Sequence, residues 1–356
     1  MAISGSSSCL ATTARASGRR KRAGVASSPR QRSGGARLRV MAYGLDTALN
    51  GADAFETCEA VADRLGQRAL VGKRVLITGA TSGIGKQTAQ TLAALGADVL
   101  ITSRIASQAE ECARELGVQA VPQDLDLSSQ ASVRAFVAEA GADVGALDVV
   151  IANAGVGFVP GKLKTAQGLD LAFGVNHLGH FTLLQGLMSS VMAAPPGRRI
   201  VVVASEAHRS IEGEFGLGEL EALEGMEHRI KSYAYSKLCN LLYAAELRRR
   251  LSSDNVGVYA FCPGVADTGL KRYLPQTDEN RALFDKMYSK ESNPAAKTIN
   301  EAAATAVHLA GAPLDELGDR LYWTNCRPLE PSASALDEGL AKQLWELSEQ
   351  WQANAH

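Results

Sequence analysis

The sequence predicts an α/β fold, in which helices cover both faces of a doubly wound parallel sheet. Along most of the 356 residues, short apolar runs alternate with stretches of helical periodicity, which is typical of right-handed βαβ units. The apolar runs contain few polar residues, as expected for strands that helices bury on both faces. A glycine-rich turn separates the first run from the first long helical stretch. Together these observations predict a single large domain over residues 72–330.

The first 41 residues differ in composition from the rest of the chain. They contain nine Lys or Arg residues, no Asp or Glu, and many Ser, Ala and Gly. So few large apolar side chains cannot offset the entropy of ordering, and we expect residues 1–41 to lie outside the fold. This composition is typical of an organelle transit peptide, whereas a secretory signal needs an apolar core. We expect import into the chloroplast, where the protein would lie in the stroma or at a membrane surface. The alternative destination is the mitochondrion. The alternative role for residues 1–41 is a basic tail that binds nucleic acid or lipid.

The overall composition excludes several other classes. Removal of residues 1–41 leaves an acidic chain, which argues against a nucleic-acid partner. No run approaches the ~18 uncharged apolar residues of a membrane-spanning helix, although peripheral membrane contact and oligomer formation stay open. The cysteines form no C-x-x-C pattern. We expect reduced thiols, with a thioredoxin-regulated disulfide as the alternative, at Cys58, Cys112, Cys239, Cys262 and Cys326.

The elements are expected in the following order. Residues 42–71 form an N-terminal extension that holds a short helix or stays mobile. Residues 331–356 form a C-terminal amphipathic helix, which packs on the domain or on a partner subunit. Helices are expected after the glycine-rich turn up to Leu95, and at 107–116 and 129–140. Strands are expected at 75–79, 97–102, 147–155, 200–205 and 256–264.

The sequence Thr-Gly-Ala-Thr-Ser-Gly-Ile-Gly at 78–85 follows a strand and opens a helix, the context of a Rossmann-type dinucleotide site. Gly79 lets the chain turn sharply, and Gly83 and Gly85 leave room for a pyrophosphate to approach the backbone. The amides and the positive dipole end of the helix then bind the phosphates. The alternative is a tight turn without a ligand. The cofactor contacts expected in this turn are Gly79, Thr81, Ser82, Gly83, Ile84 and Gly85.

The end of the second strand indicates which dinucleotide binds. An NAD site places Asp or Glu there, where the carboxylate accepts from the ribose 2′-hydroxyl. Here the strand ends in Thr102, Ser103 and Arg104, without an acid. A guanidinium can hold a 2′-phosphate through two hydrogen bonds, whereas a carboxylate would repel it. We therefore expect NADP(H) as the cofactor and Arg104 as a cofactor contact; the alternative for Arg104 is an ordinary surface charge.

Residues suited to acid–base chemistry follow further along the chain. Ser205 ends a buried strand, and Tyr233 and Lys237 open a helix, one turn apart on the same face. A phenol with a pKa of about 10 is a poor acid–base group near neutrality, but a neighbouring ammonium lowers that pKa. Ser205 is expected to hydrogen-bond the reacting oxygen. Asn176 is expected to hold a helix bend or a water for proton relay.

Taken together, these motifs resemble the short-chain dehydrogenase/reductase family. The likeness covers residues 72–330 and includes Asn-Ala-Gly at the end of a strand and Pro263-Gly264 ahead of Thr268. Asp126 is expected to contact the adenine, with Asp124 as the competing candidate. The resemblance implies a catalytic tetrad of Asn176, Ser205, Tyr233 and Lys237. It implies further cofactor contacts by Asp126, Leu127, Asn153, Ala154, Gly155, Tyr233, Lys237, Pro263, Gly264 and Thr268.

The resemblance also implies an activity: NADPH-dependent hydride transfer that interconverts a carbonyl and an alcohol, with Tyr233 as acid and base. Residues 236–251 and the C-terminal stretch are similar to the retinol dehydrogenase-like branch of the family and its plant relatives. Two alternatives stay open. One is an NADP(H)-sensing interaction module of the chloroplast, which keeps the fold but acts through a partner. The other is an enzyme like light-dependent protochlorophyllide reductase, which residues 234–240 also resemble, although that enzyme differs at Asn-Ala-Gly.

The substrate side of the site is less specific. A Glu-rich stretch lies between Ser205 and Tyr233, and residues 269–300 mix apolar and charged side chains. We expect 269–300 to form an amphipathic lid over a moderately apolar cleft, so the substrate is expected to be a lipophilic small molecule; the alternative is an ordinary surface helix. No metal is expected, because no ligand spacing is formed by His177, His180 and His208.

Overall fold

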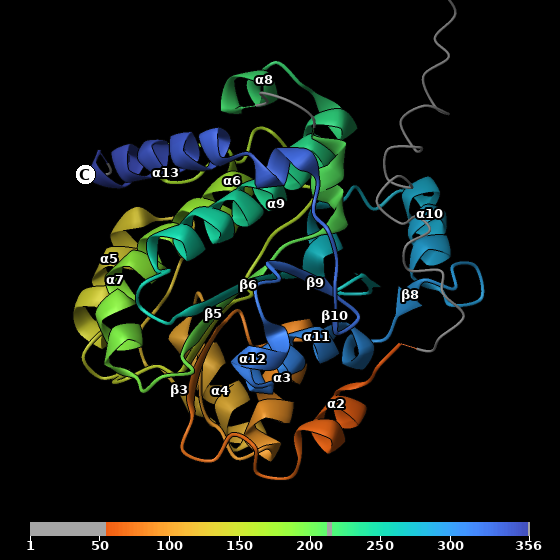
Figure 1. The fold of residues 1–356 in the computed structure, drawn as a ribbon. Helices are drawn as coiled ribbons and strands as arrows, with labels where there is room; N and C mark the ends of the chain where they lie inside the picture. The colour runs from red at the N-terminus through yellow and green to blue at the C-terminus, as the bar shows by residue number, and fades with distance from the viewer. Residues whose placement is uncertain (1–54, 212–215, 355–356) are drawn as a thin grey trace, which may run out of the picture.

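The structure, a computed structural model, describes residues 55–211 and 216–354. The expected transit peptide at 1–41 and the first part of the 42–71 extension lie outside the described residues. The described chain forms an eight-stranded sheet between two layers of helices, which confirms the predicted fold class (Figure 1). Among these residues, none of the helices combines the length and the apolarity needed to cross a membrane.

The central sheet is parallel except at one edge. Its strand order is β10-β9-β6-β5-β4-β1-β2-β3, so the chain starts near the middle and winds outward in both directions. The edge strand β10 runs antiparallel to β9, whereas the other neighbouring strands of this sheet are parallel. The bounds are β1 (Arg74–Thr78), β2 (Asp98–Thr102), β3 (Gln119–Ala120), β4 (Val149–Ala152), β5 (Arg199–Val203), β6 (Gly257–Cys262), β9 (Tyr322–Thr324) and β10 (Arg327–Pro328).

Helices cover both faces of the sheet, and successive side chains along each strand pack against opposite helix layers. On β5, Ile200 and Val202 join the core beneath α5, α7 and α9. Val201 and Val203 join the core on the other face, beneath α3, α4 and α11. The bounds are α3 (Gly83–Ala94), α4 (Ala106–Leu116), α5 (Gln130–Ala140), α7 (Gly179–Ala193), α9 (Gly225–Arg250) and α11 (Ile299–Gly311).

Two features of this arrangement differ from the sequence-based expectation. The strand β9 has no counterpart among the expected strands, because three residues are too few for a periodic signal. The helix that carries Tyr233 does not open at Tyr233, as expected, but eight residues earlier, at Gly225. Gly225 has a φ of +58°, which marks the turn before the helix, and no Gly or Pro interrupts the chain between it and Tyr233.

The two ends of the described chain lie on opposite layers (Figure 1). The N-terminal helix α2 (Cys58–Leu65) packs on α11, where the Cys58 amide donates to Asn300 Oδ1 at 2.8 Å. Both Cys58 and Val61 are fully buried, so this part of the extension is held to the domain. The C-terminal helix α13 (Glu338–Ala353) lies along α9 and so packs on the domain itself.

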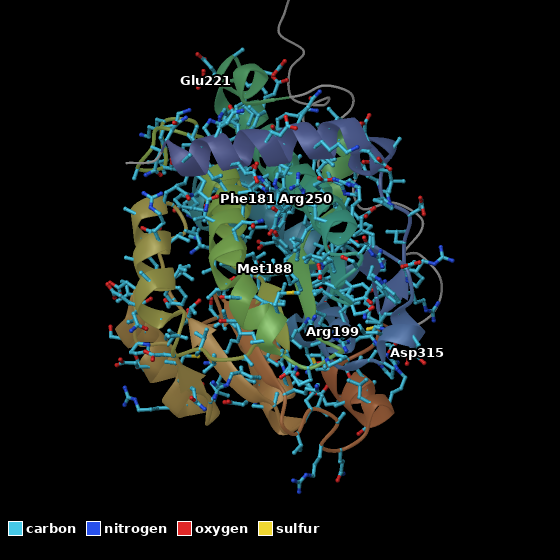
Figure 2. All side chains as sticks on the ribbon, turned by 60° about the vertical axis from the view of Figure 1, so that its left-hand side comes forward. Phe181, Met188, Arg199, Glu221, Arg250 and Asp315 are labelled. Carbon is cyan, nitrogen blue, oxygen red and sulfur yellow. The ribbon has the colours of Figure 1, made fainter. Side chains whose placement is uncertain are left out.

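Trp345 anchors α13 to the helices beneath it. Its ring meets Phe181 of α7 edge-on, with 5.1 Å between ring centroids, and stacks on Tyr243 of α9 at 5.7 Å. The Arg250 guanidinium lies 4.1 Å from the centroid of the same ring. Figure 2 shows Phe181 and Arg250 beneath α13. The last helix therefore completes the core on this face of the sheet.

Candidate active site

A cavity of about 820 Å³ opens at the carboxyl ends of the parallel strands. The ends of β1 and β4 lie at its centre, on the two sides of the point where the winding reverses. Ligands of open α/β sheets bind at this point. Every residue predicted to contact the cofactor lines the cavity, and so do Ser205, Tyr233 and Lys237. Of the predicted site residues, Asn176 alone does not.

The glycine-rich turn between β1 and α3 forms one wall of the cavity. Gly79 has a φ of +63°, and a Cβ there would lie 2.8 Å from Ala154 Cα, so the turn requires glycine. Gly83, with a φ of +55°, starts α3, and a Cβ there would be in ordinary van der Waals contact with Thr268 Cγ2 at 3.7 Å. The first turn of α3 has no acidic residue and no side-chain cap, which suits it to bind an anion.

Gly85 has a different role from the expected one. A Cβ there would lie 2.5 Å from Asn153 Nδ2 and 2.6 Å from the Gly79 carbonyl oxygen. The absence of a side chain therefore lets the turn pack against the segment after β4. The expectation that Gly85 leaves room for a pyrophosphate is wrong, because protein atoms occupy that space.

The end of β2 forms the wall where a 2′-phosphate was expected to bind. Thr102, Ser103 and Arg104 all line the cavity, and the strand ends without an acid. The Thr102 hydroxyl is buried and has no hydrogen-bond partner among the described residues. A buried hydroxyl of this kind costs free energy unless a ligand or water binds it. The wall therefore offers the Arg104 cation to an anionic ligand.

Asp126 and Asp124 separate clearly in the structure. Asp126 lines the cavity, and its Oδ1 accepts from the Ser128 amide at 2.9 Å. Asp124 Oδ1 instead accepts from the Ala106 amide at 2.7 Å, at the start of α4. Of the two candidates for the adenine contact, Asp126 is the one placed at the cavity.

A buried network holds the segment after β4 in place. The Thr78 hydroxyl accepts from the amides of Asn153 and Ala154, each at 3.0 Å, and donates to His180 Nε2 at 2.8 Å. His180 Nδ1 then donates to the Asn176 carbonyl oxygen at 3.1 Å. Burial lowers the pKa of His180 to about 4, so the ring is neutral at pH 7, as both hydrogen bonds require.

Asn176 lies within a continuous run of helical turns. It belongs to a π-helical turn, η1 (Gly174–Leu178), between α6 (Leu171–Phe173) and α7. Its Oδ1 accepts from the Val156 amide at 2.8 Å, and its Nδ2 donates to the Val156 carbonyl and to Ser236 Oγ, each at 2.9 Å. Asn176 thus ties the loop after β4 to α9 from behind the cavity.

Ser205, Tyr233 and Lys237 meet inside the cavity. Ser205 follows β5, and its Oγ accepts from the Ala207 amide at 3.2 Å and hydrogen-bonds Tyr233. Tyr233 and Lys237 share one face of α9. Lys237 Nζ donates to the Val203 carbonyl at 2.9 Å and lies 5.7 Å from the centroid of the Tyr233 ring.

Burial dominates the protonation of these groups. Burial raises the pKa of Tyr233, and the hydrogen bond with Ser205 opposes that rise. Burial lowers the pKa of Lys237 to about 8. The expected lowering of the Tyr233 pKa by Lys237 is therefore outweighed, because desolvation penalises the phenolate and Lys237 donates to Val203 instead. At neutral pH the phenol keeps its proton and can donate it.

The loop after β6 closes the cavity from the other side. Pro263, Gly264 and Thr268 line it, and Thr268 lies over Gly83. The following turn, η3 (Gly269–Tyr273), reaches the opposite wall, where Arg272 Nη2 donates to the Gly155 carbonyl at 3.1 Å. This segment therefore spans the cavity between the β6 and β4 ends of the sheet.

The part of the cavity beside Tyr233 is mostly apolar. The Phe158 ring stacks on the Tyr233 ring, with 5.7 Å between centroids and 27° between planes. Phe158 has a φ of +56°, a conformation that costs free energy for a residue with a side chain. The 269–300 segment contributes to this wall, so its expected position over the cleft agrees with the structure. The cluster comprises Phe158, Leu274, Met226, Ile230, Leu270, Met287 and Tyr288.

The comparisons with known proteins agree with this geometry. A model of the short chain dehydrogenase family matches residues 73–216. Mouse retinol dehydrogenase 14 is 39% identical over 295 residues, which cover 78% of this chain and 85% of that protein. The chain belongs to the short-chain dehydrogenase/reductase family. The resemblance inferred from the motifs is thereby confirmed, and the protein is an oxidoreductase of this family.

Several solved structures share the fold. A crystal structure of an uncharacterised Mycobacterium paratuberculosis protein has a TM-score of 0.61 and 31% identity, and covers 84% of this chain and 98% of that one. A short chain dehydrogenase from Burkholderia cenocepacia J2315, in complex with NADP, has a TM-score of 0.52 and 26% identity. The match covers 68% of this chain and 92% of the Burkholderia chain.

Three residues that shape the site of this short-chain dehydrogenase/reductase were not recognised from sequence. His180 and Phe158 are described above, and His208 lies behind Ser205. From sequence, His180 and His208 are not expected to bind a metal and are expected to be packing or surface groups; the described residues contain no group of three His, Cys, Asp or Glu arranged for a metal. Hydrogen bonds between segments far apart in sequence leave no local pattern that could have identified these histidines.

The five cysteines of the described chain are free and buried.

Proposed function

We propose that the chain is an NADPH-dependent oxidoreductase that interconverts a carbonyl and an alcohol on a lipophilic small molecule. The proposal rests on one observation: the same cavity contains the uncapped start of α3, the buried phenol of Tyr233 and the apolar wall around Phe158. Sensing of NADP(H) alone would need the first of these features, but neither the phenol–serine pair nor the apolar wall.

The residues present fit NADP(H). The start of α3 lines the cavity and has no side-chain cap, so its first amides can bind phosphate, and Arg104 lines the same cavity. The arginine suits the 2′-phosphate, which distinguishes NADP(H) from NAD(H). The Burkholderia relative binds NADP, which supports the same assignment. Asp126 and the residues 153–155 would hold the adenosine and central parts of the cofactor.

The chain's own groups supply the proton chemistry. When bound, NADPH supplies the hydride for the carbonyl carbon. Tyr233 donates its proton to the carbonyl oxygen, because burial keeps the phenol protonated. Ser205 binds the same oxygen through its hydroxyl, and the Lys237 ammonium stabilises the phenolate that proton transfer leaves behind. In alcohol oxidation the same groups act in reverse.

The apolar wall indicates the substrate class. Phe158, Ile230, Leu270, Met287 and Tyr288 surround the space beside Tyr233, so an aromatic or long aliphatic carbonyl gains free energy by leaving water there. The relative retinol dehydrogenase 14 is named for retinol, a lipophilic alcohol, and this supports the same substrate class.

Turnover with NADPH tests the proposal directly. Purified protein would be assayed against retinal, long-chain aldehydes and aromatic ketones, with NADPH consumption as the readout. We expect Tyr233→Phe to lower kcat by about 10³-fold or more while the Kd for NADPH stays within twofold. Tyr243→Phe is the matched control, because the Tyr243 hydroxyl lies on the same helix, buried and without a partner among the described residues. NADPH binding without turnover of any carbonyl would instead favour the sensing module.

A further inference from the structure

A buried histidine connects Ser205 to the C-terminal segment of the chain. His208 lies on the turn η2 (Glu206–Ser210), directly after Ser205, and is fully buried. Its Nδ1 is 2.6 Å from the Ser205 carbonyl oxygen. Its Nε2 is 3.1 Å from the Ser332 amide nitrogen, which begins the segment that leads into α13. One imidazole therefore bridges two segments 124 residues apart.

The chemistry of the two partners determines the state of the ring. A backbone amide can only donate, so Nε2 must carry a lone pair toward Ser332. A carbonyl oxygen can only accept, so Nδ1 must carry the proton toward Ser205. Only the neutral tautomer with hydrogen on Nδ1 satisfies both contacts.

The surroundings hold the ring in this orientation. Tyr322 of β9 meets the His208 ring edge-on, with 5.4 Å between centroids and 85° between planes. The Tyr322 hydroxyl donates to Glu206 Oε1 at 2.6 Å, and Glu206 Oε2 accepts from Arg209 Nε at 2.7 Å. Glu206 and Arg209, which lie on either side of His208 along η2, are thus tied to each other and, through Tyr322, to β9.

We propose that His208 is a positioning residue, through which the segment beginning at Ser332 sets the orientation of the Ser205 hydroxyl. The inference rests on the proposed function, in which that hydroxyl binds the reacting oxygen. The Ser205 peptide carries both the carbonyl held by His208 and the hydroxyl that meets Tyr233. A small rotation of this peptide moves the hydroxyl away from the substrate oxygen, and displacements of about 1 Å lower rates strongly.

A pair of substitutions at Ser332 tests the connection without touching the cavity. Ser332 has a φ of −66°, the value that a proline ring imposes, so Ser332→Pro removes the amide donor without changing that dihedral angle. Ser332→Ala keeps the amide and removes only a buried hydroxyl that has no partner in the described chain. We expect Ser332→Pro to lower kcat about tenfold, with KM and Kd for NADPH unchanged, and Ser332→Ala to match wild type. Equal kcat in the two variants would overturn the proposal.

Substitutions of His208 itself separate its two contacts. An asparagine amide reaches the position of Nδ1, and a glutamine amide reaches the position of Nε2. His208→Asn and His208→Gln should each lower kcat about tenfold, because each variant keeps only one of the two contacts that form the bridge. Circular dichroism and NADPH binding would verify that each variant is folded. A purely structural role predicts instead that kcat follows thermal stability in all four variants, and that result would also overturn the proposal.

Nuclear magnetic resonance examines the bridge independently of turnover. Long-range ¹H–¹⁵N spectra of wild-type protein distinguish a proton on Nδ1 from one on Nε2, and the His208→Asn spectrum identifies which signal belongs to His208. We expect the Nδ1–H tautomer at pH 7. An Nε2–H tautomer or a charged ring would refute the bridge. If the Nδ1–H tautomer is present but wild type reduces no carbonyl, the proposed function fails while the bridge to Ser332 stands.

Discussion

The rings of Phe158 and Tyr233 stack with 5.7 Å between their centroids, although Phe158 must adopt a φ of +56° to place its ring there. A left-handed conformation costs a residue with a Cβ about 1 kcal/mol or more. The surrounding contacts hold the strained conformation, in which the Arg229 guanidinium donates to the Phe158 carbonyl at 2.7 Å. The strain is therefore located at the wall that the substrate would touch.

Removal of the Phe158 ring should weaken substrate binding. We expect Phe158→Ala to raise KM for a lipophilic carbonyl about tenfold, because about 1.5 kcal/mol of apolar and aromatic contact is lost. Phe158→Gly removes the same ring but accepts the positive φ, so its free energy of unfolding should exceed that of Phe158→Ala by about 1 kcal/mol. Steady-state kinetics and urea denaturation measure the two effects. Equal stability of the two variants would contradict the assignment of strain.

Replacement of Arg104 should change cofactor preference. Loss of charge-assisted hydrogen bonds to a 2′-phosphate costs about 1.5–3 kcal/mol, so Arg104→Ala should raise KM for NADPH about 10- to 100-fold. Activity with NADH should stay the same, because that cofactor lacks the phosphate. Arg114→Ala, at an exposed position on α4, is the control. Equal catalytic efficiency of the wild type with NADPH and NADH would remove Arg104 from the site.

His177 should make the folded protein sensitive to acid. Burial lowers its pKa to about 3, below the ordinary value of 6.5, so the unfolded chain binds more protons between these values. The contribution of the neutral ring is fully present above pH 6.5 and is lost as the pH falls toward 3. By pH 4.5 the loss is on the order of 3 kcal/mol.

A matched variant isolates this contribution. His177 Nε2 lies 2.9 Å from Ser348 Oγ, and a glutamine at 177 can make a similar contact without titrating. Urea denaturation at pH 7 and pH 4.5 should show a smaller loss of stability for His177→Gln than for wild type. The same loss in both proteins would show that His177 is not the group that takes up the proton.

Trp345 should be required for the stability of the whole domain. Its ring contacts Phe181, Tyr243 and Arg250, so Trp345→Ala should reduce the free energy of unfolding by about 3–5 kcal/mol. Leu347→Ala, on the exposed face of the same helix, should change it by less than about 0.5 kcal/mol. Urea denaturation compares the two. Similar effects would mean that α13 packs without a dominant anchor.

Residues 1–41 should direct a passenger protein into the chloroplast. We propose this from their basic, acid-free and Ser-rich composition. A fusion of residues 1–41 to green fluorescent protein should be imported by isolated chloroplasts and shortened on import. A fusion in which four arginines are replaced by glutamate is the control. Import into mitochondria alone, or retention of the full-length fusion outside both organelles, would contradict the proposal.

Local sequence motifs predicted most of the residues that line the site. Contacts between segments distant in the sequence could not be predicted. The one-turn spacing of Tyr233 and Lys237 and the glycines after β1 predicted the cavity, because each reflects a local backbone requirement. The partners of His208 and His180 could not be predicted, because Ser332 and Thr78 approach them only after the sheet has formed. The role of Gly85 was misassigned for the same reason: its constraint comes from Asn153.

The cavity draws its lining from segments between Thr78 and Ala295, on strands at both sides of the sheet and on the turn that spans them. A molecule that fills it therefore contacts segments that are distant in sequence, and it binds only when all of them are folded. Occupancy should be thermodynamically linked to the melting of the complete domain, so each tenfold excess of ligand over its dissociation constant adds about 1.4 kcal/mol to global stability. Thermal shift can thus rank unknown ligands before any reaction has been found.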